Sequence, residues 1–192
     1  MDEPTLVRHA ANGDSSAWEP LVQTHQQAVF RLAYLLLGDP DDAEDIAQET
    51  FLRAWNHLKR FDQTRPLKPW LLSITANLAR NRQRSAGRYL AALTRAFRDE
   101  PAPASVEDKS AQYMEANDLW KAVKNLREPD QQVVYLRYFM DLSVAETADV
   151  LQVAEGTVKS RLSRALEKLR AIIKQEFPIF AERREEPEGR EA

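Results

Sequence analysis

Apolar residues recur at helical spacing along most of the chain, and residues 15–88 show only this period. The first clear apolar stripe stops at Gly38, and its members are Leu21, Ala28, Leu32 and Leu36. Asp14 and Ser15 are both suitable caps for the start of this helix, whereas Pro20 predicts a break or a kink close to that start. The pattern therefore predicts a helix that ends at Gly38 and leaves its first residue open.

Two further stripes follow in the first half of the chain. The first begins after Asp39-Pro40 and consists of Ala43, Ile46, Ala47, Thr50, Phe51, Ala54 and Leu58, so that the acids Asp45 and Glu49 project away from it. Residues 61–69 contain two prolines and are predicted to form a loop. The next helix has an apolar line of Leu67, Leu71, Ile74 and Leu78. Its opposite face carries Ser73, Asn77, Arg80, Asn81, Arg84 and Arg88.

The helical pattern is interrupted between residues 95 and 110, where prolines and alanines accumulate. Such a segment is typical of a flexible tether between domains. A second helical block covers residues 112–177, and the Glu/Arg-rich tail from residue 178 is predicted to be disordered. We therefore predict an all-α protein with two small helical domains, 1–90 and 112–177. They are joined by a flexible linker at 91–111, and the tail covers 178–192.

The second block contains the pattern of a helix-turn-helix. A helix over 130–140 ends at Asp141-Leu142, and Ser143 to Glu146 is a capping-box sequence that opens a short helix to Leu151. A tight turn at Gln152-Val153 leads into a long helix from about Glu155. Its inward residues are Val158, Leu162 and Leu169, so the polar residues between them face out. The alternative is an ordinary helical hairpin.

Composition narrows the possible functions. The chain has 43% hydrophobic and 30% charged residues, and it has no cysteine, which excludes disulfides and thiolate metal sites and suits a reducing cytoplasm. The start of the chain lacks the profile of a signal peptide, and no apolar run approaches the roughly 20 residues that span a bilayer. We therefore expect a cytoplasmic protein without membrane insertion.

Enzyme and metal chemistry find little support. The three histidines, His9, His25 and His57, lie far apart, and no HExxH motif is present. Neither a glycine-rich phosphate loop nor a Ser-His-Asp pattern stands out. We therefore expect no metal, no cofactor and no catalytic activity.

The net charge of −3 argues against a nucleic-acid partner until its distribution is considered. Residues 39–50 contain six acids and no base. Residues 60–88 contain seven bases and one acid, and residues 153–174 contain six bases and two acids. Two basic blocks in an acidic chain favour contact with nucleic acid, although either block alone also fits a solvated helix face.

Three segments carry a family resemblance. They are GDPDDAEDIAQETFLRAW at 38–55, FDQTRPLKPWLLSITANLARNRQR at 61–84 and LSVAETADVLQVAEGTVKSRLSRALEKLR at 142–170. In this order they resemble the extracytoplasmic-function class of bacterial sigma-70-type sigma factors, and the resemblance covers about residues 6–173. It implies an alternative-sigma transcription initiation factor that binds core RNA polymerase and directs it to promoters. The implied partners are the β′ clamp helices and β flap of core polymerase, promoter DNA and an anti-sigma factor.

The resemblance also implies roles for residues of the first domain. The surface that docks on the clamp helices corresponds to Asp45, Gln48, Glu49 and Arg53. In the family, the helix that follows the loop at 61–69, together with that loop, captures a base of the −10 element that has left the base stack. Removing the base from the stack costs a few kcal/mol. The corresponding residues are Phe61, Arg65, Trp70, Asn77, Arg80, Asn81, Arg84 and Arg88. Arg80, Arg82, Arg84 and Arg88 would hold phosphates without reading sequence, and the amides of Asn77 and Asn81 can both donate and accept. Trp70 fits a core position beneath the loop equally well.

In the second domain, the long helix corresponds to the helix that reads the −35 element. Its candidate DNA-binding residues are Gly156, Thr157, Lys159, Ser160, Arg161, Ser163, Arg164 and Lys168. Arg and Lys side chains can pair with guanine edges in the major groove, and Ser and Thr pair with several bases. The chain departs from the family at Gln152, where glycine is usual, at Thr147, where an aliphatic residue packs, and at Ala154, where a capping residue is common.

The main alternative is a stand-alone helix-turn-helix regulator that recognises duplex DNA without polymerase. Residues 130–170 would serve either protein. A receiver-type regulator needs alternating apolar strands upstream, and residues 15–88 show only the helical period. The sigma-factor interpretation is therefore favoured.

Overall fold

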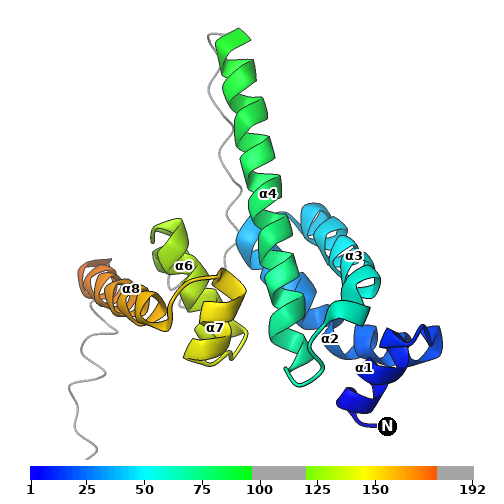
Figure 1. Cartoon of the computed structure of the whole chain (residues 1–192). Coiled ribbons are helices and arrows are strands. Elements are labelled where there is room, and N and C mark those ends of the chain that lie inside the picture. The colour runs from blue at the N-terminus through cyan, green and yellow to red at the C-terminus, as the bar shows by residue number, and fades with distance from the viewer. Residues whose placement is uncertain (97–119, 177–192) are drawn as a thin grey trace, which may run out of the picture. The chain divides into compact units, whose positions relative to one another are not determined.

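The computed structural model describes residues 1–96 and 120–176, and the side chains of 87–96 and 173–176 are left out of the description. Within these ranges the chain is helical and has no strand, which confirms the all-α prediction. The described residues form two compact units (Figure 1). The first contains α1, α2, α3, η1, α4, η2 and α7, and the second contains α6 and α8. Most of the predicted linker and all of the tail at 178–192 lie outside the described residues.

The first two helices begin at aspartate caps. The side chain of Asp2 accepts from the Thr5 amide at 3.2 Å and opens α1 (Glu3–Ala11), a helix that the sequence analysis missed. The cap followed by proline was its signal. Asp14 accepts from the Ser16 amide at 3.0 Å and opens α2 (Ser15–Leu37). As predicted, α2 ends at Gly38, which has a left-handed φ of 77°.

Pro20 lies inside α2, and the predicted break does not occur. Proline removes one backbone hydrogen bond from the helix. Ala17 and Leu21 are buried on either side of it, so packing holds the helix continuous where local propensity opposes it. Tertiary contacts thus keep α2 continuous through Pro20.

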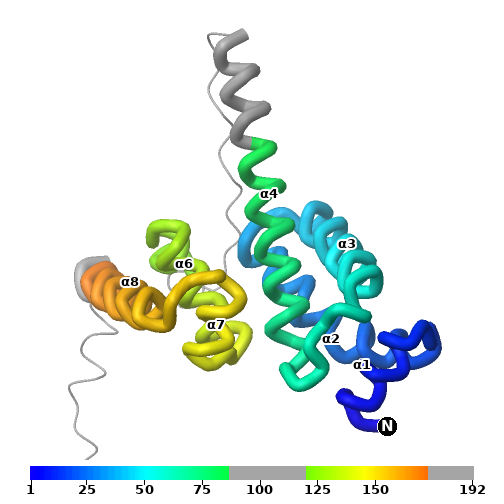
Figure 2. Tube along the Cα trace, in the orientation of Figure 1, coloured from blue at the N-terminus to red at the C-terminus, as the bar shows by residue number. Residues whose placement is uncertain are grey.

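Helices α2, α3 (Pro40–His57) and α4 (Leu67–Ala96) lie side by side in the first unit (Figure 2). The predicted stripe of α3 is confirmed, because Ala43, Ile46, Thr50 and Ala54 are buried. One core cluster contains residues from all three helices. Its members are Ala33, Ala43, Ile46 and Leu78, and Leu37 and Ile74 pack against it. The short η1 (Leu58–Arg60) ends the α3 segment.

The predicted loop at 61–69 is too long by three residues. Helix α4 begins at Leu67, so Pro69 lies in its first turn. Proline is tolerated there because the first backbone N–H groups of a helix have no partner within it. Helix α4 also continues to Ala96, past the end predicted for the first domain, through the helix-favouring Ala-Ala-Leu sequence at 91–93.

The predicted helix over 130–140 is divided in two. Helix α6 (Glu128–Val134) begins two residues earlier, and residues Tyr135–Phe139 form a π-helix, η2. The amide of Met140 donates to the Tyr135 carbonyl, five residues back, at 3.0 Å. This wider turn buries both of these residues. Asp141 then adopts a left-handed φ of 56°, which confirms the predicted break.

The capping box of α7 (Val144–Leu151) is confirmed in both directions. Ser143 Oγ accepts from the Glu146 amide at 3.1 Å, and Glu146 Oε2 accepts from the Ser143 amide at 2.7 Å. These hydrogen bonds lower the pKa of the Glu146 carboxyl. The helix ends at Gln152, whose left-handed φ of 55° explains why glycine is usual at this position.

Thr147 is the weak point of α7. It is fully buried, and within the described residues its Oγ1 has no hydrogen-bond partner. We expect Thr147→Val to raise the free energy of unfolding by about 1 kcal/mol, because an unsatisfied hydroxyl is replaced by a methyl group of the same shape. Thermal unfolding followed by circular dichroism measures the effect.

Thr50→Val is the matched control. Thr50 is equally buried, but its Oγ1 hydrogen-bonds the Ile46 carbonyl at 2.8 Å and lies 3.3 Å from Thr75 Oγ1. Its replacement should lower stability by about 1 kcal/mol. Equal changes in the two variants would contradict the argument.

Candidate functional site

The outward face of α3 carries the four residues predicted to bind polymerase. Asp45 and Gln48 are exposed, and Glu49 accepts a hydrogen bond from Arg53 Nε at 2.6 Å. Leu52 lies among them and is 62% exposed. An exposed leucine beside acids is a feature of interaction surfaces. The sequence analysis did not single out Leu52, although its position outside the apolar stripe of α3 was a signal. We call Asp45, Gln48, Glu49, Leu52 and Arg53 the acidic face.

An aromatic pair stands where α4 begins. The rings of Phe61 and Trp70 have their centroids 4.6 Å apart with planes inclined by 32°. Both residues are half-buried, so Trp70 combines packing with access to solvent. They line a cavity of about 310 Å³. Asp62 holds the loop beside them, because it accepts from the amide and hydroxyl of Thr64, which lowers the pKa of its carboxyl.

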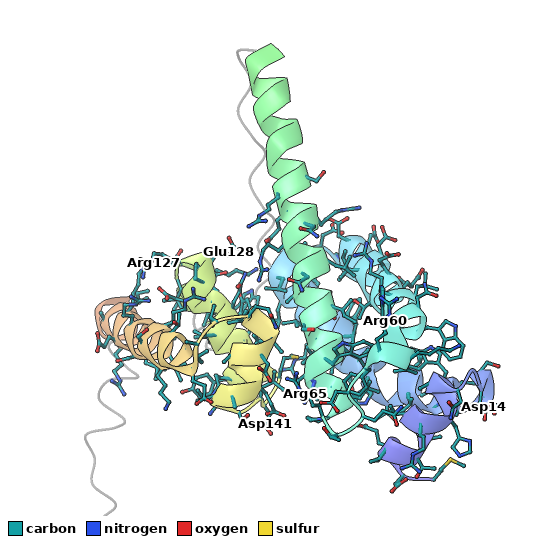
Figure 3. The ribbon with its side chains drawn as sticks, viewed as in Figure 1. Asp14, Arg60, Arg65, Arg127, Glu128 and Asp141 are labelled. Atoms are coloured by element: carbon teal, nitrogen blue, oxygen red, sulfur yellow. The ribbon has the colours of Figure 1, made fainter. Side chains whose placement is uncertain are left out.

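Arg65 lies on the loop before α4 (Figure 3). It is more than half exposed and forms an ion pair with Asp149 of α7, within the first unit. Arg65 also lines the aromatic cavity, where Asp149 is its protein partner.

The polar face of α4 is arranged as predicted. Asn77, Asn81 and Arg84 are exposed, and Arg80 is half-buried and donates from Nη1 to Asn77 Oδ1 at 3.1 Å. The side chain of Arg88 lies outside the described residues. Asn77, Arg80, Asn81 and Arg84 follow one another at helical spacing on this face of α4, after the aromatic pair, and we call them the polar line.

Arg82 differs from its basic neighbours. Its guanidinium pairs with Asp42 of α3 and lies 3.8 Å from Asp45. The hydrogen bond with Asp42 raises the pKa of Arg82. The sequence analysis expected Arg82 to hold a phosphate, whereas here it joins α3 to α4 through two carboxylates. Its position in a basic block did not reveal this contact.

Helix α8 (Glu155–Glu176) begins directly after Ala154 and presents the predicted polar residues. The exposed members are Gly156, Lys159, Ser160, Ser163, Arg164 and Lys168. Thr157 and Arg161 are half-buried, and the predicted inward residues Val158 and Leu169 are buried. Leu162, also predicted to face inward, is half-buried.

Two cations of α8 have partners in the second unit. Lys168 Nζ donates to the Asn125 carbonyl at 3.0 Å, and Arg164 Nη2 lies 3.8 Å from Asp130 Oδ1. The remaining polar contacts are short-range, for example from Ser160 Oγ to the Thr157 carbonyl at 3.0 Å. The outward side of α8 is thus basic and exposed.

Metal binding has no support among the described residues. No group of three or more suitable side chains comes together there. Of the histidines, His25 is buried and its Nε2 lies 2.9 Å from Glu3 Oε2, which ties α1 to α2. None of the described helices is long and apolar enough to cross a membrane.

Known proteins match the chain over most of its length. The family of sigma-70 region 2 matches residues 21–89, and that of sigma-70 region 4 matches residues 116–169. The ECF RNA polymerase sigma factor SigW of Bacillus subtilis is 31% identical over 173 residues, which cover 85% of this chain and 92% of SigW. The ECF sigma factor SigL of Mycobacterium tuberculosis is 31% identical over 88% of this chain and 96% of SigL. The chain belongs to the extracytoplasmic-function class of the sigma-70 family.

Solved structures agree with this assignment. The sigma factor RpoE of Bartonella quintana, in complex with the anti-sigma factor NepR, has a TM-score of 0.66 and 27% identity over 81% of this chain and 96% of that one. CnrH, in complex with the cytosolic domain of CnrY, has a TM-score of 0.69 and 26% identity over 90% of this chain and 97% of that one. In this sigma factor the acidic face, the aromatic pair and the polar line of α4 lie within the region 2 match, and the polar residues of α8 lie within the region 4 match.

Proposed function

We propose that this sigma factor binds core RNA polymerase and directs it to specific promoters. The observation that carries the proposal is that three exposed polar faces, on α3, α4 and α8, occur in one chain inside regions 2 and 4. Residues 1–90 would dock on polymerase and handle the −10 element, and residues 112–177 would read the −35 element. A stand-alone regulator would use the polar face of α8, but it would have no polymerase for the face of α3 to bind and no melted DNA for the face of α4.

The acidic face suits a basic protein surface, which for a sigma factor is that of the β′ clamp helices. Charges of opposite sign steer the encounter, and Leu52 offers an apolar centre that the charged rim would exclude from water. The β flap is the corresponding partner of the second domain. These contacts would bring both DNA-binding regions onto one enzyme.

At the −10 element, the polar line of α4 would hold melted DNA. Taking a base out of the duplex costs a few kcal/mol, which stacking and hydrogen bonds to the base edge must return. The half-exposed pair of Phe61 and Trp70 offers an aromatic surface, and Asn77 and Asn81 offer amides that can pair with a base. Arg80, Arg84 and Arg88 would bind phosphates without reading sequence.

At the −35 element, α8 would enter the major groove of duplex DNA. Arg164 is exposed in the middle of its polar side and would pair with a guanine edge. Lys159, Ser160 and Ser163 would contact bases or phosphates, and Lys168 would contact the phosphates of the DNA backbone.

The same proposal places the protein in the cytoplasm with RNA polymerase, where it acts as a transcription initiation factor and not as an enzyme. RpoE and CnrH were each solved with a protein partner, and the partner of RpoE is an anti-sigma factor. We infer that an anti-sigma factor also regulates this chain.

Run-off transcription with core polymerase across a promoter library tests the proposal. The wild-type protein should direct transcription from a subset of promoters that core alone ignores. Asp45→Lys should weaken the affinity for core by about tenfold or more, because it places like charges together in the interface. Glu19→Lys makes the same charge change on an exposed residue of α2 and should have little effect. Absence of promoter-directed transcription would refute the function, and equal losses in the two variants would refute the docking face.

A further inference from the structure

Asp130 has a buried carboxylate, and an arginine lies near each of its two oxygens. It lies in the first turn of α6 and is only 4% exposed. Arg127, next to the start of α6 (Figure 3), donates from Nε and Nη2 to Oδ2 at 3.1 and 3.0 Å. The other oxygen, Oδ1, accepts no hydrogen bond within the described residues, and Arg164 Nη2 of α8 lies 3.8 Å from it. The carboxylate is thus shared between a local arginine and one from the DNA-reading helix.

The burial of this charge makes the arrangement informative. A carboxylate withdrawn from water needs cations or hydrogen-bond donors nearby, because an uncompensated buried charge is strongly unfavourable. Arg127 occupies one oxygen, and within the described residues Arg164 is the cation within ion-pair range of the other. The attraction between Asp130 and Arg164 therefore acts across the packing of α6 against α8.

We propose that Asp130 is a positioning residue for recognition of the −35 element, acting through Arg164. An arginine on an exposed helix face samples many rotamers, and ordering it on DNA costs conformational entropy. A fixed carboxylate beside its guanidinium restricts those rotamers before DNA arrives. Arg164 remains 54% exposed, and its guanidinium has five N–H donors, so donors remain for a guanine edge.

A neighbouring contact supports the same role for this part of the second unit. Lys168, one helical turn after Arg164, donates to the carbonyl of Asn125, five residues before Asp130. Gln131 in turn caps the carbonyls of Lys124 and Leu126 at 2.7 and 2.8 Å, which holds the segment in place. One segment, residues 124–131, thus contacts two cations of α8 and is itself held by hydrogen bonds. In other recognition sites, residues behind the contacting side chains orient those side chains in the same way.

The inference rests on the proposed function, and its test uses holoenzyme assembled with core polymerase. The equilibrium affinity is measured for the preferred promoter and for variants with each −35 base pair changed. Arg164→Ala first identifies the base pair that Arg164 reads. At this position the affinity of wild type should be about 5- to 150-fold higher for the preferred base pair than for the others. Asp130→Asn should reduce that preference by about three- to tenfold and leave the preferences at other −35 positions unchanged.

A double-mutant cycle separates positioning from general stability. In the Arg164→Ala background, Asp130→Asn should produce no further change in base preference, because the side chain through which Asp130 acts is gone. Asp130→Glu, which keeps the carboxylate, should retain most of the preference. Asp130→Ser, which also removes the charge, replaces Asp130→Asn if that variant fails to fold. Val133→Ala removes buried side-chain atoms of α6 outside this pair of arginines, and shows what a loss of local stability alone does to melting temperature and to base preference.

The outcomes are distinct. Loss of preference at the Arg164 base pair alone, absent from the double mutant, supports the proposal. A uniform loss of affinity across all −35 variants, or the same change in Val133→Ala as in Asp130→Asn, overturns it and leaves Asp130 a structural residue. Tighter binding of Asp130→Asn to every sequence also overturns it, because Asp130 would then withhold Arg164 from DNA. If wild-type holoenzyme shows no promoter preference, the proposed function itself fails.

Discussion

Core RNA polymerase should tighten promoter binding by this sigma factor by about 10²- to 10⁴-fold. The free chain has a net charge of −3 and two separated basic blocks, at 60–88 and 153–174, so each block alone offers only weak, salt-dependent affinity. The sequence predicts a flexible tether between them at 91–111, which would leave their spacing open. Core would set that spacing and let the two contacts act as one multivalent unit.

Fluorescence anisotropy of labelled promoter DNA at physiological salt, with and without core, measures this effect. The Asp45→Lys variant should lose this gain in promoter affinity at core concentrations that saturate wild type, whereas Glu19→Lys should keep it. Nanomolar binding by the free protein, unchanged when core is added, would contradict the prediction and favour a stand-alone regulator.

Asn77→Ala should reduce the formation of open promoter complexes by a few-fold to about a hundredfold. Asn77 is exposed, one turn before Asn81 and two turns after Trp70, so its amide lies on the polar line that follows the aromatic pair. The variant loses one or two hydrogen bonds to an unstacked base, each worth roughly 0.5–1.5 kcal/mol net. Core binding and closed-complex formation should stay intact, because neither uses this side chain.

Permanganate footprinting on duplex and premelted templates provides the measurement. DNA already unpaired across the −10 element should restore much of the transcription, since most of the opening cost is then absent. The melting temperature of the variant should remain near that of wild type: the folded chain loses only an exposed hydrogen bond with Arg80, and alanine favours helix. A lowered melting temperature without rescue by premelted DNA would show that Asn77 only supports α4.

The ends and faces of the helices were predictable because the interactions that set them are local. Asp14 and Ser143 cap with their own side chains, Gly38 takes the left-handed turn, and each of these acts within about four residues. The inward stripe of α3 and the outward side of α8 follow equally from spacing. Sequence spacing alone therefore predicted which faces of α3, α4 and α8 point outward, and the family resemblance supplied the roles of their residues.

Only the tertiary structure decided which of those residues have protein partners. Arg82 pairs with Asp42, 40 positions away, and Arg164 faces Asp130, 34 positions away, although both arginines occur in basic blocks that read alike in sequence. The π-turn at Tyr135–Phe139 and the unbroken α2 at Pro20 likewise go against local preference. The physical reason is that these features depend on which distant elements pack together. Packing brings together ion-pair partners that are far apart in the sequence, and it can outweigh the weak local propensity of a helix turn.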